Sequence, residues 1–205
     1  SSEYKTIVNQ FMSTIPVRRF SRTVTVKQVD RIQNLAMYQS YRVKLQTMCY
    51  RETSKQGVNR SSRSQLQQLP IDRFERYPLW HATNWEVIDK ILQQGFNRSF
   101  CGKNATMYGK GVYFARDASY SSHPAYAVPD SDGVQYMLAC RVAVGEYCEG
   151  RKNALTPDFR DVTKKVLYDS TVGLLRDDDM ASPSIYVTYH DAQAYPEYLI
   201  SFKGC

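Results

Sequence analysis

The strongest candidate for a chemical site is a run of glycine, aromatic and small hydroxyl residues in the middle of the chain. Val112–Ala115 is apolar and aromatic, which is typical of a short buried strand. Gly109 and Gly111 stand directly before it, where they allow a sharp turn or a close approach of the backbone to a ligand. A small-residue segment of helical character follows, so the strand delivers Tyr113, and the start of the helix Ser121, to one region. The spacing therefore predicts a ligand site that includes a phenol and a hydroxyl group.

The elements that must position this site are predicted from apolar periodicity. Helical spacing predicts helices over Glu3–Thr14, over Leu35–Arg51 and from the cap residue Asn84 to about Gln94. Besides 112–115, alternating or β-branched runs predict strands over 23–29, 78–83, 134–144, 165–172, 184–189 and 198–203. Residues 51–72 are predicted to form mostly surface loop. Because helices come early and strands late, the order favours an α+β fold with antiparallel sheets over a doubly wound sheet.

Length and composition predict a single domain that covers residues 1–205. No apolar run approaches the ~18 residues of a membrane-spanning helix, so no membrane is expected among the partners. The first residues lack the features of a signal peptide, and the missing Met suggests the C-terminal part of a longer protein. The cysteines are widely spaced, which disfavours a zinc site or a disulfide framework and is typical of a cytoplasmic or nuclear protein.

The chain is basic, with a net charge of +7. The Lys and Arg side chains gather loosely in two stretches, formed by Arg18, Arg19, Arg22, Lys27 and Arg31 and by Arg51, Lys55, Arg60 and Arg63. Such a charge favours acidic partners, among them nucleic acid, phosphates and a dinucleotide substrate. A solvated basic surface without a specific partner explains the same pattern equally well.

Several motifs, in order and at matching spacing, resemble one enzyme family. Gly109–Ala115 and the upstream Leu79–Thr83 resemble the catalytic domain of the poly(ADP-ribose) polymerase-like ADP-ribosyltransferases. Gly95–Ala105 and Asp191–Ile200 are similar to segments of its macrodomain-containing, mono-ADP-ribosylating branch, and the resemblance covers about residues 30–203. It implies the diphtheria-toxin-like ADP-ribosyltransferase fold, in which two apposed mixed sheets flanked by helices hold NAD in a cleft. A helical regulatory subdomain is not expected.

The resemblance implies NAD as the co-substrate and no metal. Breaking the bond between the ribose and the nicotinamide of NAD releases a neutral leaving group, so the site needs orientation and charge stabilisation rather than a strong acid. By resemblance, His81 hydrogen-bonds the ribose hydroxyl next to the adenine, and Thr83 supplies a further hydroxyl. Ala82 stands where the family usually has Gly. Its backbone N–H and C=O are expected to hold the nicotinamide carboxamide, and its Cβ restricts φ and fills space.

The same resemblance assigns roles to four further residues. Tyr113 flanks the nicotinamide ribose, and Ser121 donates a hydrogen bond to the carboxamide oxygen. Tyr126 stacks on the nicotinamide ring, a contact that stabilises by ~0.5–1.5 kcal/mol beyond area burial. Arg98 approaches the pyrophosphate. Taken one at a time, these residues also fit ordinary roles: core histidine or tyrosine, surface serine, loop tyrosine and solvated arginine.

The third position of the expected catalytic triad falls on Ile185. Relatives that extend ADP-ribose chains carry Glu there, and an isoleucine can neither accept a proton nor accept a hydrogen bond. A neutral sugar hydroxyl is then hard to activate as a nucleophile, whereas an acceptor that is already an anion needs no such help. The sequence therefore resembles mono-transferases with a His-Tyr-Ile triad.

The leading interpretation is a mono-ADP-ribosyltransferase that modifies Glu or Asp side chains of acceptor proteins, itself included. A second is a catalytically inactive domain that serves as a binding module, which Ala82 favours and which the retention of His81, Tyr113, Ser121 and Tyr126 disfavours. A third keeps the enzyme but makes the acceptor a terminal phosphate of a nucleic acid, as the basic charge allows.

Overall fold

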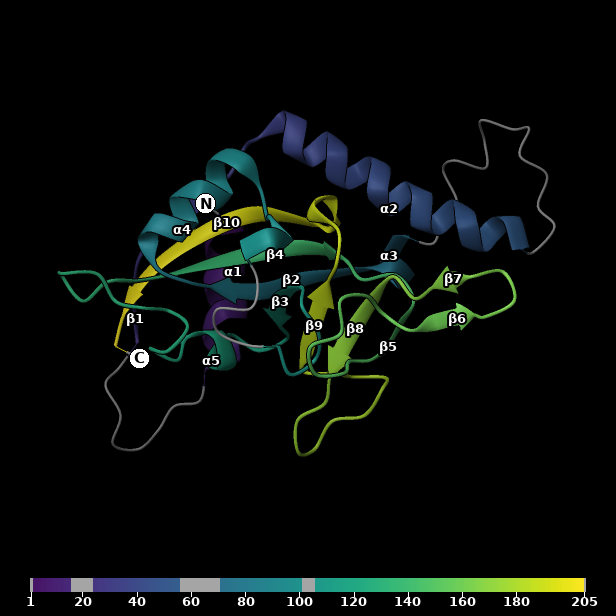
Figure 1. Cartoon of the computed structure of the whole chain (residues 1–205). Coiled ribbons are helices and arrows are strands. Elements are labelled where there is room, and N and C mark those ends of the chain that lie inside the picture. The colour runs from purple at the N-terminus through teal and green to yellow at the C-terminus, as the bar shows by residue number, and fades with distance from the viewer. Residues whose placement is uncertain (1, 16–23, 56–70, 101–105, 205) are drawn as a thin grey trace.

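The computed structural model describes residues 2–15, 24–55, 71–100 and 106–204. Within these ranges, strands from all along the chain join in a mixed sheet of eight strands (Figure 1). Its order is β1 (Thr25–Arg31), β10 (Ala194–Lys203), β4 (Gln135–Ala143), β2 (Glu75–Ala82), β3 (Val112–Ala115), β9 (Ile185–Thr188), β8 (Ser170–Gly173) and β5 (Tyr147–Glu149). Neighbours are antiparallel except for the parallel pair β8 and β5. A separate hairpin pairs β6 (Phe159–Asp161) with β7 (Val166–Leu167).

The large sheet has a narrow joint in its middle. β2 and β3 pair only through Trp80 and Ala115, whereas β2 pairs with β4 at six positions. In Figure 1, β10 and β4 run across the view while β9 and β8 run up and down, so the two halves differ strongly in strand direction. The predicted α+β class is confirmed, and the two expected sheets are joined at this one residue pair. Beyond it, β2 and β3 diverge.

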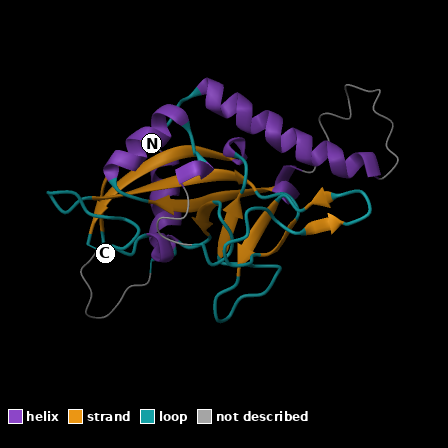
Figure 2. Cartoon of the chain, viewed as in Figure 1, coloured by secondary structure: helices purple, strands orange, loops and turns teal. Residues whose placement is uncertain are grey.

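Helices cover both faces of the sheet (Figure 2). On one face lies α4 (Trp85–Gln94), and on the other lie α1 (Ser2–Ser13) and the short α5 (Ala118–Ser121). The long helix α2 (Leu35–Lys55) packs on the same face as α1, where it contacts Ala143 of β4 and Tyr195 of β10. The short helix α3 (Ile71–Phe74) leads into β2, and two 3₁₀ turns, η2 (Arg98–Phe100) and η3 (Asp191–Gln193), follow α4 and β9.

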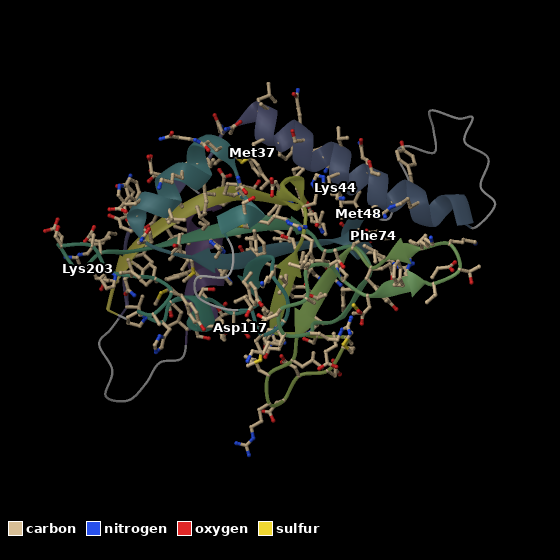
Figure 3. The ribbon with its side chains drawn as sticks, viewed as in Figure 1. Met37, Lys44, Met48, Phe74, Asp117 and Lys203 are labelled. Carbon is tan, nitrogen blue, oxygen red and sulfur yellow. The ribbon has the colours of Figure 1, made fainter. Side chains whose placement is uncertain are left out.

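The alternation of side chains along the strands creates the core on both faces. On β2, Leu79 packs with Ile88 and Ile91 of α4, whereas its neighbour Trp80 packs with Phe11 of α1 on the opposite face. Further along this opposite face, α2 buries Tyr41, Leu45, Met48 and Cys49 against α3 and the sheet, and Figure 3 shows Met48 beside Phe74. The site lies where these layers meet the diverging ends of β2 and β3.

Most predicted elements are present, with differences that have physical causes. The second predicted helix continues to Lys55, and the predicted strand over 165–172 is two short strands, β7 and β8. The closing strand begins at Ala194, whereas the prediction began at Tyr198. The first residues of the strand were missed because they include Pro196, and the register shifts between Pro196 and Tyr198. A proline cannot donate to the ladder, so the sequence pattern breaks there. α3, β5 and β6 were not predicted.

Several sequence predictions fall on residues that the structure does not describe. These are Arg18, Arg19, Arg22, Arg60 and Arg63 of the two basic stretches, residues 56–70 of the predicted surface loop, and residues 101–105 of the family-like segment Gly95–Ala105. Among the described helices, none is long and apolar enough to cross a bilayer.

Candidate functional site

A cavity of about 520 Å³ lies between α4, the diverging ends of β2 and β3, α5 and β9. Its volume is in the range of small-molecule and cofactor sites, roughly 300–1,000 Å³. All the predicted site residues except Arg98 line it. The lining residues are His81, Ala82, Thr83, Val87, Lys90, Ile91, Gln94, Gly95, Phe96, Asn97, Gly111, Val112, Tyr113, Phe114, Ala115, Tyr120, Ser121, Tyr126 and Ile185. The structure thus brings together residues from five separate elements.

His81 bridges the gap between the diverging strands. Its Nδ1 lies 2.8 Å from the carbonyl oxygen of Tyr113, and because a carbonyl can only accept, Nδ1 carries the proton. Burial lowers the pKa of His81, so the ring is neutral at neutral pH. Nε2 is then left as a hydrogen-bond acceptor. The ring is held from the sides by Phe96 and Phe114, with centroid distances of 5.2 and 5.6 Å. The geometry presents one fixed acceptor, suited to a ligand hydroxyl.

The hydroxyl of Tyr113 makes two hydrogen bonds to backbone groups of the protein itself. It donates to the carbonyl oxygen of Gly109 at 2.7 Å and accepts from the backbone N–H of Tyr108 at 3.0 Å. Tyr113 therefore fastens the glycine-containing loop before β3 to the strand itself. What it offers the cavity is the side of its ring, which agrees with a flanking role.

Two stacked tyrosines form one wall of the cavity. The rings of Tyr120 and Tyr126 lie 5.3 Å apart at 19°, and their hydroxyl oxygens are 3.2 Å apart. Burial, together with the hydrogen bond to Tyr126, raises the pKa of Tyr120, so the phenol of Tyr120 is neutral at neutral pH. Next to them, Ser121 Oγ donates to the carbonyl oxygen of Trp80 at 3.1 Å. In this arrangement Ser121 offers lone pairs to an amide N–H, and it must leave Trp80 to donate to an amide oxygen.

Ile185 lies at the floor of the cavity. It is buried, at 1% exposure, and packs with Ala115, Val187 and Tyr189. The described lining residues include no carboxylate. Within the described part of the cavity wall, no acidic side chain is therefore present to act as a general base.

The backbone at Ala82 needs no glycine. Among the described non-glycine residues, positive φ occurs at Asn153 and Lys165, so Ala82 has a conformation that any L-residue adopts. Its side chain packs against the cluster that contains Trp80, on the face of β2 opposite to His81. The sequence-based concern that the Cβ of Ala82 crowds the ligand is therefore not supported by the backbone geometry.

We expect Ala82→Gly to leave affinity for NAD within about twofold of the wild type, because the substitution removes no polar group and relieves no strain. Stability is expected to fall by about 0.5–1 kcal/mol, since glycine gains backbone entropy in the unfolded chain. Isothermal calorimetry and thermal melting of both forms measure the two quantities. Clearly tighter binding by Ala82→Gly would show that the Cβ does crowd the site.

Arg98 is not among the described residues that line the cavity. Its Nη1 donates to the carbonyl oxygen of Tyr189 at 2.8 Å, and its backbone N–H donates to Asp191 Oδ1 at 3.1 Å. Both partners follow β9, so Arg98 fastens the loop after α4 to that end of the sheet. A contact between Arg98 and a pyrophosphate stays a prediction.

Sequence reasoning missed two lining residues of note, Tyr120 and Lys90. Tyr120 directly precedes Ser121, but only the structure shows that its ring stacks on Tyr126. Lys90 shares a helix face with Val87 and Gln94 by spacing, which the sequence does contain. That this face borders the cavity depends on how α4 packs against the sheet.

Comparison with known proteins agrees with this geometry. The sequence model of the poly(ADP-ribose) polymerase catalytic domain matches residues 1–204. The chain belongs to the poly(ADP-ribose) polymerase catalytic-domain family. It is 33% identical over 202 residues to human protein mono-ADP-ribosyltransferase PARP14, and 33% identical over 205 residues to mouse protein mono-ADP-ribosyltransferase PARP10. These alignments cover 98% and 100% of this chain but 10% and 19% of the relatives, so the chain spans a small part of each.

Enzymes of the poly(ADP-ribose) polymerase family use NAD as co-substrate, and the described residues fit such a ligand. The cavity offers an aromatic wall for a planar ring, a serine for an amide and a neutral imidazole acceptor for a sugar hydroxyl. In the part of the chain that the structure describes, no group of three or more His, Cys, Asp or Glu side chains is placed to hold a metal ion.

Proposed function

We propose that this domain transfers single ADP-ribose units from NAD to acceptor proteins, with release of nicotinamide. Relatives that are 32–33% identical to this chain carry the name protein mono-ADP-ribosyltransferase, which supports the activity. The observation that carries the proposal is the composition of the cavity: His81, Tyr113 and Ile185 line it together, and no carboxylate lies among the described lining residues.

Different residues of the cavity bind different parts of NAD. Tyr126, supported by Tyr120, stacks on the nicotinamide ring, and Ser121 with the Ala82 backbone holds the carboxamide. His81 Nε2 accepts from a ribose hydroxyl, and Thr83 lies beside it. Tyr113 flanks the second ribose. These contacts fix the reacting carbon relative to the acceptor, which is the main contribution that a site without acid–base groups can make.

The acceptor must bring its own negative charge. When the ribose–nicotinamide bond breaks, its electron pair neutralises the pyridinium nitrogen, and an ionised carboxylate oxygen forms the new bond to the ribose carbon. Neither event requires a proton from the enzyme. Glu and Asp side chains meet this requirement, so we propose acceptor proteins, this one included, as the partners. A terminal phosphate of a nucleic acid carries the same charge and is the alternative acceptor.

The expected product is one ADP-ribose unit per modified residue. Chain growth requires a base to activate a ribose hydroxyl, and Ile185 and its neighbours supply none. Incubation with excess NAD, followed by intact mass measurement, is expected to show increments of single units. Fragmentation identifies the modified residue type, and parallel reactions with a 5′-phosphorylated oligonucleotide test the alternative acceptor.

Ile185→Glu is the matched variant for this prediction. It adds the missing carboxylate at a buried position, so a loss of stability of about 2 kcal/mol or more is expected. It is not expected to yield polymers, because chain growth also requires an acceptor cleft that holds an ADP-ribose chain, and a single carboxylate does not create one. A ladder of long chains from the wild type would refute the proposed single-unit transfer, and absence of nicotinamide release would favour an inactive binding module.

A further inference from the structure

One cationic side chain stands out in the wall of the cavity. Among the described lining residues, Lys90 is the single Lys or Arg, and there is no Asp or Glu. The other polar members are neutral hydroxyls and amides, together with His81. The electrostatic character of the described lining is therefore set by one residue that the assignment of roles has not used.

The packing of α4 places Lys90 at the solvent-exposed side of the cavity. Val87, Lys90 and Gln94 follow at intervals of three and four residues, so they share the face of α4 that borders the cavity. All three are exposed, as is Asn97 in the loop that follows. These four residues form the exposed rim of the cavity. The buried lining residues, such as Ile91, Phe114 and Ile185, lie deeper.

The charge distribution of NAD matches this arrangement. Its pyrophosphate carries two negative charges, and charges are costly to bury among apolar side chains unless they are paired or hydrated. The exposed rim provides both water and an ammonium group. The part of the cavity formed by the buried Ser121 and the two half-buried, stacked tyrosines suits the nicotinamide, whose ring and amide carry no phosphate.

The arginine expected to contact the pyrophosphate has part of its guanidinium bound to the chain itself. Arg98 Nη1 is bonded to the carbonyl oxygen of Tyr189, and Arg98 is absent from the described lining. We propose that Lys90, rather than Arg98, pairs with the pyrophosphate of NAD and makes this site selective for a dinucleotide. This inference rests on the proposed function, because it assigns a further binding residue to the same cavity.

The test compares Lys90→Gln with two controls by calorimetry. Lys90→Arg keeps the charge, and Lys5→Gln removes one charge from the exposed surface of α1, outside the described lining. The ligands are NAD, ADP-ribose and a benzamide, which has the aromatic amide but no phosphate. For Lys90→Gln we expect the Kd of NAD and of ADP-ribose to rise by about three- to tenfold at low salt, as for one partly exposed charge-assisted contact.

The benzamide Kd is expected to stay within twofold in every variant, and Lys90→Arg and Lys5→Gln are expected to bind NAD like the wild type. Raising the salt is expected to narrow the gap between wild type and Lys90→Gln, because screening weakens the contact that only the wild type makes. An unchanged NAD Kd in Lys90→Gln, an equal loss in Lys5→Gln, or an equal loss of benzamide binding would each overturn the role of Lys90 alone. A wild type that binds benzamide but neither NAD nor ADP-ribose would overturn the proposed function as well.

Discussion

Replacing His81 with alanine is expected to lower ADP-ribosyl transfer at least about a hundredfold, the loss that follows when a reacting centre is displaced. The substitution removes the Nε2 acceptor and also the Nδ1 bond to the Tyr113 carbonyl that spans the gap between β2 and β3. His81→Asn separates the two effects. Its side-chain amide can donate toward Tyr113 as Nδ1 does, but it has no group in the place of Nε2.

Nicotinamide release measures turnover, and circular dichroism with thermal melting measures folding. Both variants are expected to lose turnover, whereas His81→Asn is expected to melt closer to the wild type than His81→Ala. A folded His81→Asn with wild-type turnover would show that Nε2 is not needed. It would also remove the main support for the assigned ribose contact.

The same residue gives the fold a pH dependence with a definite sign. Burial holds the pKa of His81 below its ordinary value of about 6.5. As the pH falls through that value, the unfolded chain takes up a proton that the folded chain refuses, so the free energy of unfolding decreases. The contribution is fully present above the unfolded pKa, and His81→Asn is expected to flatten this part of the stability profile.

Gly111→Ala is expected to damage both the fold and the activity. A Cβ at this position would stand 2.3 Å from the carbonyl oxygen of Thr188 and 2.7 Å from Cγ1 of Val187. Both atoms belong to β9, and a backbone carbonyl in a sheet cannot simply move aside, so β3 must shift and take Tyr113 with it. We expect a loss of about 3 kcal/mol or more, from overpacking. For a domain of this length that lowers the Tm by about 6–12 °C.

Gly133→Ala is the matched control. Gly133 has a φ of 73°, and no heavy atom lies within 4 Å of the Cβ position, so the substitution costs backbone strain without a clash. That strain is about 1 kcal/mol, and nicotinamide release is expected to be unchanged. Equal Tm values for the two variants, or a fully active Gly111→Ala, would show that β3 and β9 are not in the close contact described.

The sequence predicted best what local chemistry determines. Asn84 was expected to cap α4, and its Oδ1 accepts from the Val87 N–H at 2.9 Å. β3 was placed correctly because a short apolar run that directly follows two glycines and ends at charged residues has few alternatives. The site residues His81, Tyr113, Ser121 and Tyr126 were found by motif, and they meet in one cavity.

The features that the sequence did not predict depend on contacts between elements that are far apart along the chain. The strand β5 exists through a three-residue parallel contact with β8, which no local pattern encodes. The bond from the Arg98 guanidinium to the carbonyl oxygen of Tyr189 joins segments that are far apart in the sequence, which no local pattern encodes. Lys90 and Tyr120 have no distinctive sequence context, and only the packing of α4 and α5 against the sheet places them in the cavity wall.

The narrow joint between β2 and β3 gives the sheet an internal edge. In the register set by Trp80 and Ala115, the next rung of the ladder would join Ala82 to Tyr113, and that rung is missing. Alternate peptide groups of β2 still face the gap, as they do at any unpaired strand. A carboxamide has the same N–H and C=O as a peptide group, so a nicotinamide can act as the missing rung. The carboxamide would then bind as an added strand binds to a sheet edge, through hydrogen bonds to main-chain atoms of β2. Because glycine and alanine have the same main-chain atoms, this binding would not depend on which of the two stands at position 82.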